Sequence, residues 1–320
     1  MQPPFSITPG ILTLVSEISV LLGRYEGLHA PVPQPLLRRR NRIRTIKDSL
    51  AIEGNTLHLD QVTAILEGKR VIGSKQEIRE VQNAARLYES LHDLKPDSAK
   101  DLLRAHRVLM SGLNRDAGKY RSGGVGILKG IKVSHVAPPA KQVPRLMEEL
   151  FGFLKDKSGL SPIVRACVFH YELEFIHPFS DGNGRIGRFW QSLILARFHN
   201  AFSYVPVESL IRERQGAYYR ILERCDRNGD STEFIEFSLE NIRDALRDFL
   251  HHLKPEVQTS ESRLDLARKE FARKEFSRKD YLHYFKTIST ATASRDLARG
   301  VLAKKLAKSG SQSTARYRFR

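Results

Sequence analysis

The sequence predicts a mostly α-helical protein with a β-hairpin and a small basic C-terminal domain. Apolar residues recur at helical spacing along most of the 320-residue chain, for example in 11–24 and 162–176. Strand-like segments are few, and the clearest surrounds a Lys129-Gly130 turn in 125–140. A polar stretch at 254–262 reads as a linker, so we expect the chain to divide there.

The composition is that of an ordinary folded protein, with 41% hydrophobic and 28% charged residues. No segment has the roughly 18 consecutive apolar residues that a membrane span needs. The start, MQPPFSITPG, has no secretory pattern, and Cys167 and Cys225 are too few for a disulfide framework. We therefore expect a cytoplasmic protein that does not bind membranes.

The net charge of +17 favours polyanionic partners such as nucleic acid, nucleotides or acidic protein surfaces. Residues 262–320 hold 16 Lys and Arg against 5 Asp and Glu, a net charge of +11. Solubility alone is the simpler explanation of this charge, but its concentration in one region favours a partner.

The helices are expected in order along the chain, with glycine or proline at their ends. Arg38 to Arg44 form a basic cluster on the second of them, either a solvated face or a contact for anions. The expected ranges are 11–24, 36–54, two or more helices in 56–95 with turns near Gly68 and Gly73, 101–110, 143–153, 162–176, 185–197, 209–224 and 232–254.

The C-terminal region 263–320 has the plan of a winged helix-turn-helix domain. The repeated ARKEF of 267–276 predicts a charged helix, Ser277 caps the next, and Thr290–Ala298 forms another before a hairpin at Ser309-Gly310. Small polar residues of that last helix suit a DNA major groove, and nearby basic residues suit phosphates. These are Ser289, Thr290, Thr292, Ser294, Arg295, Lys304, Lys305, Lys308 and Arg316. Protein contact or dimerisation is the alternative use of such a domain.

The segment HPFSDGNGRIGR, residues 177–188, carries the chemistry. A Gly-Asn-Gly loop that opens a helix presents unpaired N–H groups and the positive end of the helix dipole to an anion. Arg185 and Arg188 can fork around phosphate oxygens, Asp181 suits Mg²⁺, and His177 suits removal of a proton from a hydroxyl. Together they indicate phosphoryl or nucleotidyl transfer; the alternative is a buried histidine beside a glycine turn.

This segment resembles the Fic family signature His-x-Phe-x-(Asp/Glu)-Gly-Asn-Gly-Arg-x-x-Arg at every fixed position. Gly118-Lys119-Tyr120-Arg121 and the hairpin after it resemble the segment that forms the family's flap. The resemblance covers most of 1–245 and implies a Fic-type helical bundle with a β-hairpin flap. It implies an N-terminal helical region over 1–97, a catalytic domain over 98–253, the linker at 254–262 and the winged-helix domain over 263–320.

The family implies a protein adenylyltransferase that uses ATP and Mg²⁺ to modify a Ser, Thr or Tyr hydroxyl of a target protein or of itself. His177 would be the general base and Asp181 would hold the metal. The resemblance assigns ATP binding to Gly182, Asn183, Gly184, Arg185, Gly187, Arg188, Tyr218 and Tyr219. Asp226 stands where the family often has an Asn that contacts adenine. The docking strand of the flap would be Lys132, Val133, Ser134, His135 and Val136.

Upstream, Ser49-Leu50-Ala51-Ile52-Glu53-Gly54 resembles the family's inhibitory motif, (Ser/Thr)-x-x-x-Glu-(Gly/Asn). Ser49 and Glu53 are four residues apart and share one face of the helix expected at 36–54. Glu53 would contact Arg188 and keep the γ-phosphate from it; the alternative is an ordinary Ser and Glu at a helix end. Removal of AMP, transfer of phosphate or phosphocholine, and a DNA-binding regulator that senses nucleotide remain alternative functions.

Overall fold

The structure is a computed structural model that describes residues 3–28, 35–124, 126–129, 132–156, 159–253, 259–272, 274–285, 288–311 and 314–320. For 126–129, 132–136 and Lys269 it describes the backbone alone. The chain forms two compact units, Met1–Leu253 and Lys254–Arg320. No helix in the described ranges is long and apolar enough to cross a membrane.

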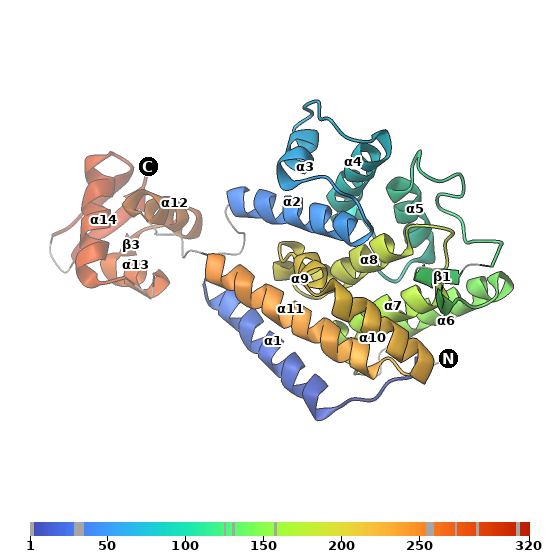
Figure 1. Cartoon of the computed structure of the whole chain (residues 1–320). Helices are drawn as coiled ribbons and strands as arrows, with labels where there is room; N and C mark the ends of the chain where they lie inside the picture. The colour runs from blue at the N-terminus through green and yellow to red at the C-terminus, as the bar shows by residue number, and fades with distance from the viewer. Residues whose placement is uncertain are drawn as a thin grey trace. The chain divides into compact units, whose positions relative to one another are not determined.

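The first unit is helical apart from one hairpin and three short 3-10 turns (Figure 1). The prediction of a mainly helical protein is therefore confirmed. Its elements are α1 (Pro9–Gly27), α2 (Pro35–Ile52), α3 (Leu59–Leu66), α4 (Lys75–Glu89), α5 (Ala99–Leu109), β1 (Gly126–Lys129), β2 (Lys132–Val136), α6 (Val143–Lys155), α7 (Pro162–Ile176), α8 (Asn183–Phe198), α9 (Val207–Glu213), α10 (Gln215–Asn228) and α11 (Thr232–His252).

Helices α7 and α8 form the centre of this unit. α7 is buried along almost its whole length, which its apolar residues on every face permit. α8 packs along α7, while α1 lies beside α11 and α2 contacts α3, α4 and α9 (Figure 1). The helix expected over 209–224 is instead two helices, α9 and α10, which meet at Arg214.

β1 and β2 pair antiparallel, from Gly126 opposite Val136 to Lys129 opposite Lys132. The register shifts between Ile127 and Leu128. Among the described strands, β2 has β1 as its single partner.

The second unit has its own small core. It contains α12 (Ser260–Phe271), β3 (Phe276–Ser277), α13 (Arg278–Tyr284), α14 (Thr290–Leu302), β4 (Leu306–Ser309) and β5 (Arg316–Phe319). Its sheet is antiparallel in the order β3-β5-β4. Ser277 caps α13 as expected, in a capping box with Asp280.

Two expectations for this region are wrong. The repeated ARKEF is not one helix, because α12 ends at Phe271 and the second copy leads into β3. Residues five apart on a helix point about 140° away from each other. The break instead lets Phe271 and Phe276 stack with ring centroids 4.4 Å apart. The expected linker 254–262 is also too long, because Ser260 begins α12; residues 254–258 lie outside the described ranges.

Candidate active site

The loop between α7 and α8 is shaped in part by its own residues. His177 ends α7 in the left-handed conformation, with φ 49° and ψ 59°, and Gly182 precedes α8 with φ 84°. A side chain at Gly182 would lie 2.8 Å from the sulfur of Met110. The Asn183 amide accepts from the Phe179 N–H and donates to the Phe179 carbonyl, both at 2.9 Å. The side chain of Asn183 is therefore occupied, and its backbone is what it can offer to a phosphate.

A carboxylate from the N-terminal part of the chain already occupies the start of α8. One carboxylate oxygen of Glu53 lies in the space that a side chain at Gly184 would need. The same oxygen is 2.8 Å from Nη2 of Arg188. The N-terminus of a helix attracts negative charge. Glu53 thus sits where the sequence predicts phosphate.

Arg188 is 1% exposed and contacts Ser49 of α2 and Glu53, which directly follows α2. Its Nε lies 3.2 Å from Ser49 Oγ, and its Nη2 lies 2.9 Å from the Ser49 carbonyl oxygen. Burial opposes the charge of this guanidinium, but nearby negative charge, above all that of Glu53, raises the pKa of Arg188. Nη1 of Arg188 is buried and has no hydrogen-bond partner among the described residues.

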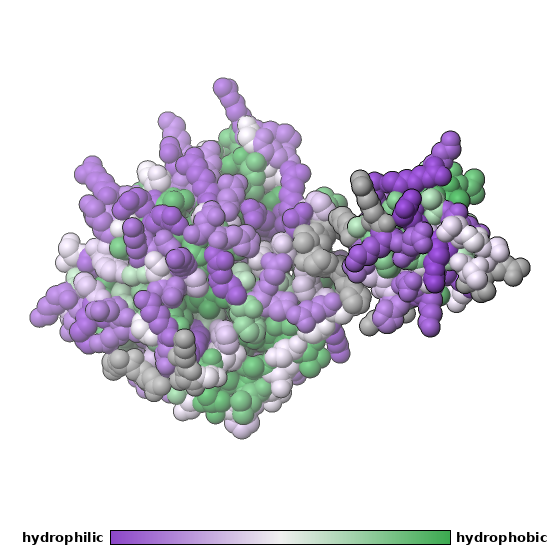
Figure 2. Space-filling view, turned by 180° about the vertical axis from the view of Figure 1, so that it is seen from behind, coloured by the Kyte–Doolittle hydropathy of each residue, from purple (hydrophilic) through white to green (hydrophobic). Residues whose placement is uncertain are grey.

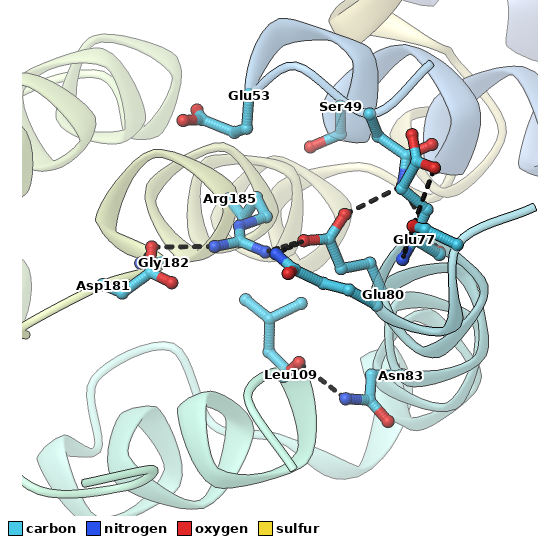
Figure 3. A network of polar contacts seen from close by, with 12 residues as sticks. Ser49, Glu53, Glu77, Glu80, Asn83, Leu109, Asp181, Gly182 and Arg185 are labelled. Carbon is cyan, nitrogen blue, oxygen red and sulfur yellow. Dashed lines mark hydrogen bonds and ion pairs between the residues drawn. The ribbon is translucent and has the colours of Figure 1, made fainter. Parts of the chain in front are cut away.

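Arg185 lies between two carboxylates (Figure 3). Its Nη2 is 2.9 Å from Asp181 Oδ1 and its Nη1 is 3.5 Å from Glu80 Oε1. The other oxygen of Glu80 accepts a hydrogen bond of 2.8 Å from Asn55. Nε of Arg185 is buried and has no partner in the described part of the chain. Both arginines of the motif therefore keep a donor that no group of the described residues uses.

One contact of His177 bears on its tautomer. Its Nδ1 lies 3.2 Å from the carbonyl oxygen of Glu174, which can only accept, so Nδ1 carries the hydrogen. Nε2 is then the ring nitrogen that can take a proton. The carbonyl of His177 in turn accepts a hydrogen bond of 2.7 Å from Arg121 Nε.

Other residues expected at the site are placed differently. A side chain at Gly187 would meet Glu174 and His170, so this glycine faces α7 and not the phosphate loop. Tyr218 is 1% exposed and its hydroxyl lies 3.3 Å from His170 Nε2. Tyr219 is 39% exposed and donates to the Ile52 carbonyl. For 132–136, the residues expected to dock the target, the structure describes the backbone and not the side chains.

His106 and Arg121 reach the site without being expected there. His106 is completely buried, accepts from the Gly118 N–H at 2.9 Å, and lies 2.9 Å from the Asp181 carbonyl oxygen. Burial lowers its pKa to about 4, so this ring is neutral and donates to Asp181 through Nε2. A lone histidine on a helix gave no signal in the sequence, whereas Arg121 ends a segment that the family resemblance includes.

The comparisons with known proteins agree with this site. Residues 96–195, which include the whole motif, match the Fic/DOC family. A Fic family protein from Desulfovibrio desulfuricans G20, solved as a crystal structure, is 42% identical, with a TM-score of 0.75 over 100% of this chain and 98% of that one.

Two curated relatives are more distant. Protein adenylyltransferase Fic of Nematostella vectensis is 34% identical over 202 residues, 60% of this chain and 45% of that protein. Protein adenylyltransferase fic-1 of Caenorhabditis briggsae is 31% identical over 220 residues, 64% of this chain and 41% of that protein. The chain thus spans less than half the length of these two relatives. Since the Desulfovibrio protein is 42% identical and is covered over 98% of its length, the chain belongs to the Fic/DOC family.

Proposed function

We propose that this protein transfers AMP from ATP to a Ser, Thr or Tyr hydroxyl of a protein, and that Glu53 holds the enzyme inhibited. The observation that carries the proposal is the Glu53 carboxylate lodged against Gly184 and Arg188 at the start of α8. The Glu53 carboxylate lies at the N-terminus of α8, where backbone N–H groups and the helix dipole favour negative charge. The names of the two curated relatives support the adenylyl group as the one transferred.

The residues present fit ATP and Mg²⁺. The unpartnered Nε of Arg185 and Nη1 of Arg188 are donors suited to phosphate oxygens. The carboxylate of Asp181, with its side chain 56% exposed, would hold Mg²⁺. Among the described residues no three metal-ligating side chains gather, which suits an ion that takes most of its ligands from phosphates and water. Bound there, Mg²⁺ would neutralise phosphate charge.

In this mechanism Nε2 of His177 takes the proton of the target hydroxyl. The hydroxyl oxygen then bonds to the α-phosphorus, the bond from that phosphorus to the bridging oxygen breaks, and pyrophosphate leaves. Arg185 and Arg188 would steady the β- and γ-phosphates. The outer edge of β2 would hold the target segment by pairing with it as an added strand.

Labelling with α-³²P-ATP tests this function in wild type, Glu53→Gly and Glu53→Gly/His177→Ala. We expect label on Glu53→Gly at least about tenfold above wild type, since a contact worth about 1.4 kcal/mol or more is removed. The His177→Ala change should return the signal to background. Label from γ-³²P-ATP would instead show phosphate transfer. Removal of AMP from a modified protein by wild type would make Glu53 a residue of the reverse reaction.

We also propose that residues 263–320 form a winged helix-turn-helix domain that binds DNA. The observation in favour is that the polar start of α14, capped by Ser289, is exposed within a unit of strongly positive charge. A protein that contacts phosphates loses affinity steeply as salt rises. Binding to a fluorescent duplex at 50 and 200 mM salt would show this loss; no binding at either salt would leave protein contact as the use of this unit.

A further inference from the structure

We propose that Arg121 is a positioning residue of this enzyme, which ties both ends of the β1–β2 flap to the backbone of His177. The inference rests on the adenylyl transfer proposed above. It concerns a residue that would touch neither ATP nor the reacting atoms.

The Arg121 guanidinium donates hydrogen bonds to four backbone carbonyls, and we call this set of contacts the clamp. Its Nε donates to the His177 carbonyl at 2.7 Å, and its Nη2 lies 3.2 Å from the Ile176 carbonyl at the end of α7. Nη1 donates to the Gly123 carbonyl at 2.9 Å, and Nη2 donates to the Pro138 carbonyl at 2.5 Å. Gly123 precedes β1 and Pro138 follows β2. One side chain therefore joins the two ends of the flap to the end of α7.

The charge of Arg121 is satisfied without an acid. The residue is 5% exposed, and no carboxylate of the described residues pairs with it. Burial lowers the pKa of this guanidinium, but an arginine stays charged at neutral pH. The carbonyls at the C-terminal end of α7 carry the negative end of the helix dipole and compensate it.

The contact with His177 explains why a single guanidinium matters to the chemistry. A left-handed conformation such as that of His177 is uncommon for residues other than glycine. The bond from Arg121 to the His177 carbonyl, together with the 2.9 Å bond from the Arg121 N–H to the Pro178 carbonyl, holds the backbone in it. Loss of the clamp should displace the ring of His177 and separate the flap from it.

The test is Arg121→Lys in the Glu53→Gly background. Lysine keeps the positive charge, but its ammonium has three donors on one atom and cannot bond to all four carbonyls. Arg165→Lys is the matched control: Arg165 is 7% exposed and donates to the carbonyls of Phe153 at 2.7 Å and Leu160 at 3.2 Å, away from the motif. Three quantities are measured: AMP transfer at saturating ATP, the Kd of ATP by calorimetry, and hydrogen exchange of the amides of 126–136.

We expect Arg121→Lys to lower the transfer rate about 100-fold, the loss that misplacement by about 1 Å can cause. The Kd of ATP should stay within about threefold, and exchange of the flap amides should rise about tenfold. Arg165→Lys should change none of the three. If Arg121→Lys does not fold, Arg121→Gln, which removes the buried charge, replaces it.

Equal losses in the Arg121 and Arg165 variants, an unchanged transfer rate, or unchanged exchange of the flap would each overturn the proposal. A parallel loss of ATP affinity would place Arg121 in the nucleotide site instead. Absence of transfer by the Glu53→Gly parent would contradict the proposed function. Hydrogen exchange would still decide in that case whether Arg121 holds the flap.

Discussion

At the scale of single residues, buried charges near the motif are balanced by groups from several helices. Glu172 on α7 is partly buried and has no basic group to offset its charge among the causes that shift its pKa. Burial, with a smaller contribution from the charge of Asp226, raises the pKa of Glu172 to about 7. Between about pH 4.5 and pH 7, the Glu172 carboxyl therefore keeps a proton in the folded protein that it has lost in the unfolded chain.

This difference gives stability a pH dependence with a definite sign. Between about pH 4.5 and pH 7 the native state holds more protons than the unfolded state at this residue, so its contribution to stability falls as pH rises. Glu172→Gln should remove this fall in stability with rising pH, because glutamine does not titrate. At pH 8 we expect the variant to melt at a higher temperature than wild type, corresponding to a gain of up to about 3 kcal/mol in the free energy of unfolding. At pH 4.5 the difference in melting temperature should be much smaller. The exposed Glu148 on α6 offers a control substitution, Glu148→Gln, which should show no such trend.

At the scale of elements, the end of α2 is fastened to α4 directly after Glu53. Asn55 donates to Glu80 Oε2 at 2.8 Å and lies 3.3 Å from the Glu77 carbonyl oxygen. Glu80 in turn faces Arg185 (Figure 3). The same network thus joins the segment after α2 to Arg185, the first arginine of the motif.

Asn55→Ala should loosen this end of α2. The loss of hydrogen bonds worth about 0.5–1.5 kcal/mol should raise AMP transfer by roughly two- to tenfold in the protein that retains Glu53. In the Glu53→Gly background the same change should have almost no effect, because the contact it supports is gone. Rates of the two single variants and the double variant form the measurement, and equal increases in both backgrounds would separate Asn55 from the inhibition.

At the scale of the whole molecule, each of the two units has its own hydrophobic core, and the two units differ in net charge. The larger core spans α1 to α11, while the smaller is built around Phe276, Tyr281 and Leu297. Hydrophilic side chains spread over most of the face of both units seen in Figure 2. Of the net charge of +17, the last 59 residues carry +11.

DNA binding should therefore depend on the second unit. We expect affinity of the full chain for duplex DNA to fall by about a thousandfold or more between 50 and 200 mM salt, if six or more phosphates are contacted. A protein ending at Leu253 should lose DNA binding and keep AMP transfer in the Glu53→Gly background. Retained DNA binding by that shorter protein would place the nucleic-acid surface in the first unit.

Much of the helical order could be predicted because amphipathic spacing, caps and glycine turns act within a few residues of one another. The prediction failed where tertiary packing outweighs local preference, as at the second ARKEF copy, where Phe276 is needed in the core. The burial of Tyr218 could not be predicted either, since nothing local distinguishes a buried tyrosine from one that faces a ligand.

The functional character of 177–188 could be predicted from the sequence, because its glycines, arginines and helix start are neighbours in the chain. Of the distant groups that meet this loop, Glu53 was expected from the family resemblance, whereas the places of Glu80 and Arg121 follow from tertiary packing. Glu53 lies 135 residues from Arg188, Glu80 lies 105 from Arg185, and Arg121 lies 56 from His177. Such contacts depend on how α2, α4 and the flap pack around α7 and α8, which no spacing along the chain encodes.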